Sequence, residues 1–303
     1  MLRTVRIPAL LLLLSTIAAA EEEAVELKLH WEPGHTYMQE SDTDTVNFLT
    51  AIGKTSDQKL RLHQTTRITV KKNERDQTEA QVLVESLLGE MTYEGQTHAY
   101  DSKNPAASHP LLQRSFGGAA GRGFTLVYDA KDQFIDAKDA AASAQPGVEP
   151  DLVDIANARQ LADLYRRSLE MGLPSIPVRP GDKWISEQLV VFPQAGNVEV
   201  KLNSKFDGVV EREGRRQAQI AFEGIMKTQR DKDGNGRELT TERPVTMGDD
   251  SKVNGHVFFD LDRRTISLAV FSATLQLKIE GKPMPVRQQV TTRLVSMRPT
   301  EAP

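Results

Sequence analysis

The chain has 303 residues, of which 39% are hydrophobic and 26% are charged, with a formal net charge of −4 and no cysteine. This composition is typical of a globular protein with a substantial core, and it excludes disulfides, cysteine-ligated zinc and thiol chemistry. The acidic balance also disfavours nucleic-acid binding, which requires a basic face.

The first 20 residues have the pattern of an export signal. Arg3 and Arg6 precede an apolar stretch over residues 7–17, and the run of alanines that ends at Ala20 offers a small-residue cleavage site. The apolar stretch is shorter than the roughly 20 residues that span a bilayer. We therefore expect residues 1–20 to be a signal peptide and the mature protein to be periplasmic or extracellular, without a transmembrane segment. An uncleaved N-terminal anchor is the alternative.

Most of the remaining chain alternates between apolar and polar residues, which is typical of half-buried antiparallel strands. The parity of the apolar positions changes within residues 266–279, and this change predicts a β-bulge near Phe271-Ser272. The alternating segments are residues 24–31, 59–71, 78–86, 198–211, 215–229, 256–260, 266–279 and 286–296.

Three short landmarks occur twice, in the same order along the chain. This repetition indicates two related β units, residues 21–136 and residues 181–298. The landmarks are Pro33-Gly34 with Tyr37, which returns as Pro180-Gly181 with Trp184; the segment 80–85, which returns as 218–223; and the segment 126–129, which returns as 257–260.

A linker over residues 137–180 is expected between the two units, and it contains the one convincing helix. Over residues 151–171, apolar residues recur at spacings of three and four, as on one face of a helix. Asp151 is the predicted N-cap, and Gly172 and Pro174 end the helix. The predicted fold class is α+β and mostly antiparallel β: two related β units, twisted sheets or half-barrels, joined by one long helix.

The order of these motifs resembles a family of exported bacterial proteins that is classified as a domain of unknown function. The resemblance covers nearly the whole mature chain, and it implies export and a β-rich fold. It supplies no catalytic residue. Its motifs are the two Pro-Gly-x-x-aromatic turns, Tyr100-Asp101-Ser102, the segment 121–126, Leu173-Pro174 and Pro177.

The sharpest local motif is a possible calcium loop over residues 231–242. Asp231, Asp233, Asn235 and Glu242 match the ligand positions of D-x-[DN]-x-[DN]-G-x5-E, in which oxygen atoms wrap Ca²⁺. The preceding residues alternate like a strand, not like the entering helix of an EF-hand. A plain hairpin loop is the other interpretation, because Asp-Gly and Asn-Gly favour turns.

Other candidate motifs are incomplete. The glycine-rich residues 117–123 could approach a phosphate, but they lack the Lys-Ser/Thr of a P-loop and precede a strand pattern. Ser56 and Lys59 fit S-x-x-K without the partner motifs of a serine enzyme. The six histidines are scattered, and solvated or hydrogen-bonded single histidines are the favoured interpretation; the alternative is that His98 and His109 converge with a carboxylate across a loop.

The repeated aromatic positions admit two interpretations. Tyr37 and Trp184, and Trp31 with the same ambiguity, could stack on a ligand or pack in the core. Their place after equivalent turns favours the core.

No catalytic residue, metal ligand or cofactor is therefore assigned from the sequence. We expect an exported, soluble and non-enzymatic protein that binds an apolar ligand or lipid on a concave β-sheet. A structural or partner-binding module of the cell envelope is one alternative, and a hydrolase with a spatially assembled site is another. The expected partner is a lipid, another apolar ligand or an envelope protein, and not nucleic acid.

Overall fold

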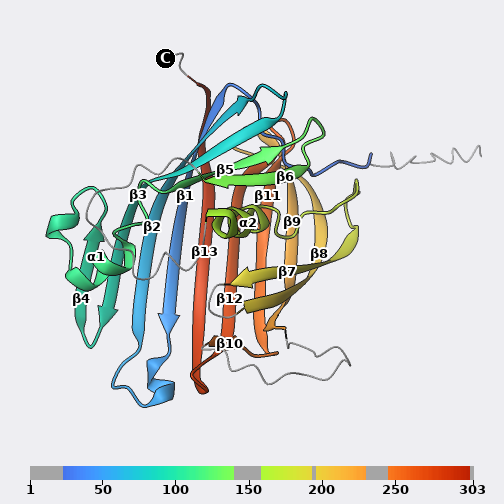
Figure 1. Cartoon of the computed structure of the whole chain (residues 1–303). Coiled ribbons are helices and arrows are strands. Elements are labelled where there is room, and N and C mark those ends of the chain that lie inside the picture. Colours follow the sequence, from blue (N-terminus) through green and yellow to red (C-terminus); the bar gives the residue numbers. More distant parts are fainter. Residues whose placement is uncertain (1–22, 140–157, 193–195, 230–244, 301–303) are drawn as a thin grey trace, which may run out of the picture.

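The computed structural model describes residues 23–139, 158–192, 196–229 and 245–300, and one continuous antiparallel sheet dominates this part of the chain (Figure 1). The order of the main strands across the sheet is β6-β5-β3-β2-β1-β13-β12-β11-β9-β8-β7, with β4 paired to β3 and β10 paired to β12. The strands are β1 His35–Asn47, β2 Gln58–Lys72, β3 Thr78–Tyr93, β4 Gln96–Asp101, β5 Gly123–Tyr128, β6 Phe134–Asp139, β7 Lys183–Phe192, β8 Gly196–Arg212, β9 Arg215–Thr228, β10 Val245–Met247, β11 Ser251–Asp260, β12 Thr265–Ile279 and β13 Lys282–Pro299.

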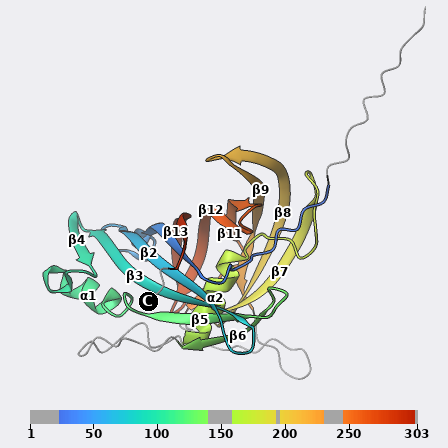
Figure 2. The ribbon, with the colours of Figure 1, turned by 90° about the horizontal axis from the view of Figure 1, so that it is seen from above.

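The described helices are short. They are α1 Pro110–Phe116, α2 Ala158–Leu169 and two 3₁₀ turns, Leu49–Ile52 and Pro105–Ala107. The sheet curves around α2, which lies on its concave side and contacts β5, β6 and β7 (Figure 2). The curved sheet therefore has an inner, concave face and an outer face.

The expectation of two β units joined by one long helix is wrong. Strand β1, near the start of the described chain, pairs along its whole length with β13, the last strand, so a single sheet runs through both halves. The described helix α2 has 12 residues, and it packs inside the curve of the sheet instead of joining two bodies. Local periodicity could not show this, because the pairing of β1 with β13 joins segments at opposite ends of the chain. The division at residues 137–180 stays a prediction.

The two Pro-Gly turns have the same geometry. Gly34 and Gly181 have positive φ values of 77° and 91°, which glycine adopts without steric cost. The amide of Gly34 donates to the carbonyl of Val70 on β2 over 2.9 Å, and the amide of Gly181 donates to the carbonyl of Phe206 on β8 over 2.7 Å. Each turn thereby fixes the start of one strand, β1 or β7, against its neighbour.

The β5–β6 and β11–β12 hairpins are also alike. The Asp129 carboxylate accepts from the amides of Lys131 and Gln133, and the Asp260 carboxylate accepts from the amides of Asp262 and Arg263. Each hairpin has a register shift next to this aspartate. In β12 the extra residue is Ser267, so the bulge lies nearer the turn than the predicted Phe271-Ser272.

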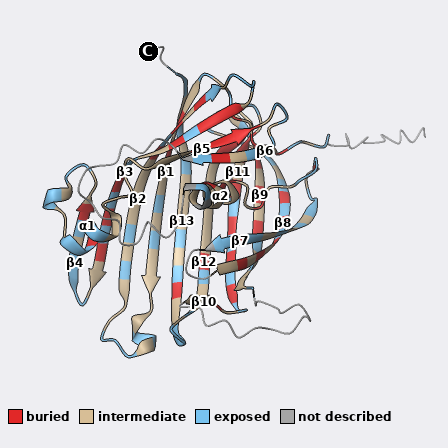
Figure 3. Ribbon diagram, in the orientation of Figure 1, coloured by how far each residue is buried: buried red, intermediate tan, exposed pale blue. Residues whose placement is uncertain are grey.

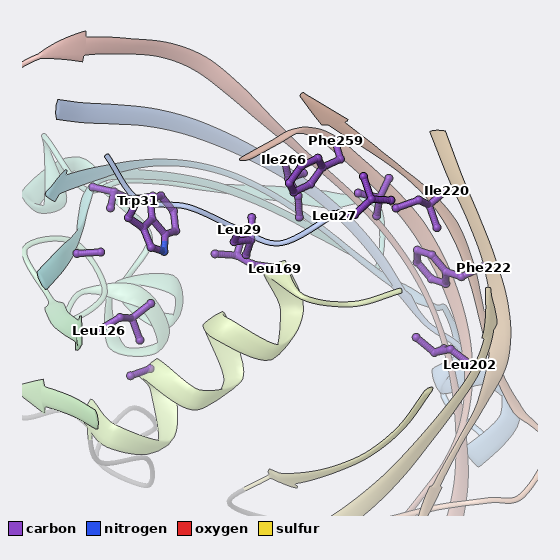
Figure 4. Close-up of a cluster of buried hydrophobic side chains, with 14 of the residues drawn as sticks. Leu27, Leu29, Trp31, Leu126, Leu169, Leu202, Ile220, Phe222, Phe259 and Ile266 are labelled. Atoms are coloured by element: carbon purple, nitrogen blue, oxygen red, sulfur yellow. The ribbon is translucent and has the colours of Figure 1, made fainter. Parts of the chain in front are cut away.

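The main hydrophobic core fills one half of the concave face (Figures 3 and 4). It joins side chains of the central strands to α2 and to residues 24–33, which run across the face as an extended segment. Residues 24–31 form no strand, since the single isolated bridge there joins Val25 to Val178. The alternation in this segment reflects the burial of Leu27, Leu29 and Trp31.

Candidate binding site on the concave face

Away from the strand ends, the inner face of the central sheet carries no acidic or basic side chain. On β1 the inward positions from residue 37 to residue 47 are Tyr, Gln, Ser, Thr, Thr and Asn, whereas Glu40, Asp42 and Asp44 point outward. The inward positions in the middle of β2, β7, β8, β9, β11, β12 and β13 are likewise free of Asp, Glu, Lys and Arg. The charged residues at inward positions of these strands lie near strand ends: Lys72, Glu211, Arg216 and Lys282. Charged residues make up 26% of the whole chain, so their absence from the inward positions in the middle of the strands does not reflect a shortage of charged residues in the sequence.

Strand register aligns two neighbouring rows of residues across this face, which we call the upper row and the lower row. Each row crosses β7, β8, β9, β11, β12, β13, β1, β2, β3 and β4 in that order. The upper row is Trp184, Ser204, Phe222, Gly255, Phe271, Val290, Thr43, Leu62, Gly89 and Tyr100; the lower row is Ser186, Leu202, Gly224, Val253, Ala273, Gln288, Thr45, Leu60, Met91 and His98.

Burial along the upper row changes from its ends to its centre. Ser204 and Phe222 near one end, and Tyr100 at the other, are buried. The four central residues Phe271, Val290, Thr43 and Leu62 are partly exposed. The centre of the concave face therefore presents aromatic and aliphatic side chains, with one hydroxyl between them, at an accessible surface.

Neutral polar side chains on β1 form hydrogen bonds along the inner face. The hydroxyls of Ser41 and Thr292 are 2.9 Å apart, and the Asn47 amide donates to Gln58 over 2.8 Å. The hydroxyl of Thr43 lies between its cross-strand neighbours Leu62 and Val290 and makes no hydrogen bond to a described residue.

On the inner face of β7 and β8, three polar atoms are buried without a hydrogen-bond partner among the described residues. They are Nε1 of Trp184, Oγ of Ser186 and Oγ of Ser204. Trp184 and Ser204 lie directly opposite each other on β7 and β8, and Ser186 follows two residues along β7. A buried donor without a partner destabilises a protein by about 1–3 kcal/mol, so an orphaned group in a native fold requires an explanation.

The outer face differs in chemistry. One hollow of about 740 Å³ is lined by outward residues that include Lys183, Lys205, Glu223 and His256, and it also reaches the upper-row residues Trp184, Ser204, Phe222 and Gly255 between them. Another of about 610 Å³ is lined by residues that include Asp42, Asp44, Arg61, Glu90 and Asp101. These hollows are flanked by hydrated charges, so they do not suit an apolar ligand.

Burial also controls the ionisation of tyrosines around the core. It raises the pKa of Tyr37 to about 12 and raises the pKa of Tyr128 and Tyr165 further. Desolvation likewise raises the pKa of Glu170, although Arg166 is its ion-pair partner. Burial therefore disfavours the charged form of each of these groups.

His98 and His109, for which single histidines were the favoured interpretation, lie next to each other. The rings of His98 and His109 stack with centroids 3.9 Å apart, and Nδ1 of His109 accepts from the amide of Leu111 at the start of α1. Within the described ranges, no group of three or more His, Asp or Glu side chains could hold a metal ion.

The other motifs fall at different places. Residues 231–242, with Asp231, Asp233, Asn235 and Glu242, and the signal segment 1–20 lie outside the described residues. The glycine-rich run follows α1 and leads into β5. The hydroxyl of Ser56 accepts from the amide of Glu94, while Lys59 lies on β2.

The repeated aromatic residues pack in the main core. Tyr37 is fully buried, and its ring meets Trp31 edge to face at 5.2 Å. Trp184 packs partly buried against the same core.

The inward polar residues of β1 were missed from the sequence, because residues 35–47 show no apolar alternation. A different signal is present there. Uncharged residues at odd positions alternate with Glu40, Asp42 and Asp44 at even positions, which is a period of two in charge. That pattern identifies a strand with one uncharged face.

No protein-family model matches the sequence, and no curated protein matches it. Solved structures with similarity to the chain include lipovitellin, with 12% identity and a TM-score of 0.47, over 90% of this chain and 26% of that chain. The chain thus spans about a quarter of the lipovitellin chain.

Two further neighbours cover most of both chains. A DUF1329 family protein from Desulfovibrio piger has 8% identity and a TM-score of 0.18, over 88% of this chain and 85% of that chain. The Pseudomonas aeruginosa MucA/MucB complex has 12% identity and a TM-score of 0.15, over 88% and 94%. All three scores are below 0.5, so these likenesses carry no functional argument.

Of the helices in the described ranges, none is both long enough and apolar enough to cross a bilayer.

Proposed function

We propose that this chain is an exported, non-enzymatic protein that binds a lipid or another amphipathic apolar ligand on the concave face of its sheet. The single observation that carries the proposal is the absence of charged side chains from the inner face of the central strands away from the strand ends. A sheet face that functions only in contact with water has no reason to exclude charges, whereas a face that contacts hydrocarbon does, because burying an unpaired charge is costly.

The partial exposure at the centre of the face supports the same function. Phe271, Val290 and Leu62 are accessible in the described structure, and their burial by a ligand would be favourable by about 25 cal/mol for each Å² removed from water. The other half of the face is already covered by α2 and residues 24–33, so the protein has its own core and does not need a ligand to fold.

A matched pair of substitutions on β13 tests this function. The protein is incubated with vesicles of dioleoylphosphatidylcholine, separated from them, and analysed by native mass spectrometry for bound lipid. Val290→Asp places a charge at the centre of the inner face, and we expect it to reduce lipid retention by about tenfold or more. Thr291→Asp places the same charge on the outer face of the same strand and should leave retention unchanged. Wild-type protein that retains no lipid would contradict the proposal.

The alternative function of a partner-binding module is favoured by one observation. Strand β7 is the last strand of the sheet, and its outward side chains Ile185, Leu189 and Val191 are exposed by 62%, 41% and 43%. An exposed apolar edge strand can accept a strand from a partner. Replacement of Ile185 and Leu189 by lysine should abolish such an association, measured by light scattering, without changing lipid retention.

A further inference from the structure

Trp184, Ser186 and Ser204 place three orphaned polar atoms within one small part of the concave wall. Ser204 is only 2% exposed, and its Oγ has no hydrogen-bond partner in the described residues. Directly opposite residues on antiparallel strands have Cβ atoms about 4.5–5.5 Å apart, so Trp184 and Ser204 are immediate neighbours. These polar atoms can therefore act on one bound group.

The surroundings of these atoms are apolar. Leu202 and Phe222, the nearest inward neighbours on β8 and β9, are buried, and Figure 4 shows both side chains on the inner face of the sheet. The ring of Phe222 lies close to Gly172, just beyond α2, and to Gly255 on β11, so these glycines leave the space that the ring occupies. Only a polar group carried inside a largely apolar molecule fits such an environment.

The chemistry of the three atoms selects the class of that polar group. The indole N–H of Trp184 can only donate, and each serine hydroxyl can donate, so the group that they recognise is an acceptor. No cation lies at the inward positions next to these atoms to neutralise a carboxylate or phosphate, and the lysines of these two strands, Lys183 and Lys205, occupy outward positions. An uncharged carbonyl oxygen, as in an ester or amide, meets both conditions.

Resting on the proposed function, we infer that Trp184, Ser186 and Ser204 bind the ester carbonyl of an uncharged acyl lipid, whose hydrocarbon lies along the inner face. The upper row connects this point to the accessible centre, since Ser204 is aligned through Phe222, Gly255 and Phe271 with Val290. The ligand class is thus a neutral ester lipid and not a fatty-acid anion.

A comparison of an ester with its ether analogue tests the inference. Phosphatidylcholine vesicles are doped with dioleoylglycerol, with the dioleyl ether of glycerol, which lacks both carbonyls, or with oleate, and retained lipid is measured by native mass spectrometry. We expect dioleoylglycerol to be retained about 2- to 10-fold better than the ether, which is the effect of one hydrogen bond. Ser204→Ala should remove most of that preference. Ser272→Ala, on the outer face of β12, should not.

The stability of the lipid-free protein provides a second readout. Ser204→Ala removes a hydroxyl without a partner, so its melting temperature should equal or exceed that of the wild type. A lower melting temperature with unchanged ester preference would show that Ser204 binds an internal water and would overturn the inference. Equal retention of ester and ether, or preferential retention of oleate, would also overturn it while leaving the proposed function intact. No retention of any lipid would overturn the proposed function itself.

Discussion

The hydroxyl of Tyr165 on α2 donates a hydrogen bond of 2.7 Å to Oε1 of Gln39 on β1, across 126 residues of sequence. Gln39 is 4% exposed, and it is the first inward polar residue on β1 below the buried Tyr37. This bond fixes the helix to the strand that passes through the middle of the concave face. It lies where the filled half of the face meets the accessible half.

Tyr165→Phe should destabilise the protein by about 1–3 kcal/mol, because it leaves the buried amide oxygen of Gln39 without its donor. Urea denaturation followed by circular dichroism measures the change. Tyr93→Phe, at the partly exposed end of β3, is the control; its hydroxyl bonds the side chain of Glu94 near the surface, so the change in stability should be less than about 0.5 kcal/mol. Equal effects of the two substitutions would show that the bond to Gln39 contributes nothing.

The buried tyrosines should make the protein sensitive to alkali. The pKa of Tyr37 is about 12 in the folded protein against 10.0 for an unperturbed tyrosine, because burial disfavours the phenolate. The resulting stability is present below pH 10 and is lost as pH rises through 12, since only the unfolded chain ionises in that window. Tyr37→Phe should therefore show a smaller fall in unfolding free energy between pH 9.5 and 11.5. Parallel curves for variant and wild type would contradict this assignment.

Glu79 on β3 should contribute stability that is lost in acid. Its carboxylate accepts a hydrogen bond from Lys138 over 2.8 Å and lies 3.6 Å from Lys71, and the bond to Lys138 is the largest cause of its lowered pKa. A lowered pKa stabilises the fold above the ordinary Glu value of 4.5, and this stability disappears as pH falls through the folded value.

Glu79→Gln should therefore lower the unfolding free energy by about 1 kcal/mol at pH 7, a small value because both lysines are exposed to solvent. Below the folded pKa of Glu79, the substitution should have no effect on the unfolding free energy. Thermal denaturation from pH 2.5 to pH 7 measures the difference. Glu85→Gln, on the same strand, is the control: the Glu85 carboxylate pairs with Arg67 but is more exposed than that of Glu79, so the substitution should cost less at every pH.

Gly255→Ala should disturb the curved sheet. A Cβ atom there would lie 2.4 Å from the carbonyl oxygen of Val270, 2.6 Å from the ring of Phe222 and 2.8 Å from Cβ of Phe271. We expect a loss of about 1–3 kcal/mol in unfolding free energy and weaker lipid retention, because Phe222 and Phe271 must move. Asn254→Ala changes an exposed residue on the outer face and should have little effect. A stable variant with wild-type retention would mean that the rings tolerate displacement.

Part of the fold was predictable from local pattern. The alternation over residues 59–71 and 198–211 predicted strands that became β2 and β8, because side chains on a strand point alternately to its two faces. By contrast, residues 24–31 alternate but form no ladder, since alternation reports burial on one side and not the presence of a hydrogen-bonded neighbour. Strand β1 was missed for the opposite reason, as its inward face is polar.

The candidate site could not be predicted in the same way. Trp184 was interpreted as a core residue, and Ser186 and Ser204 carry no motif. They form a group only because β7 and β8 pair in one register and because the two serine hydroxyls and the indole N–H find no partner among the described residues.

The sequence by itself determined which residues of each strand face inward and which bear charge, because these depend on a two-residue period that each strand carries within itself. It also determined the turns at Gly34, Gly181, Asp129 and Asp260, where local hydrogen bonds and backbone conformation suffice. Only the tertiary structure decided that β1 pairs with β13, that one sheet curves around α2, and that residues from ten strands align in one uncharged row. These features depend on contacts between residues far apart in the chain, whose free energy is gained only when all the strands pack together.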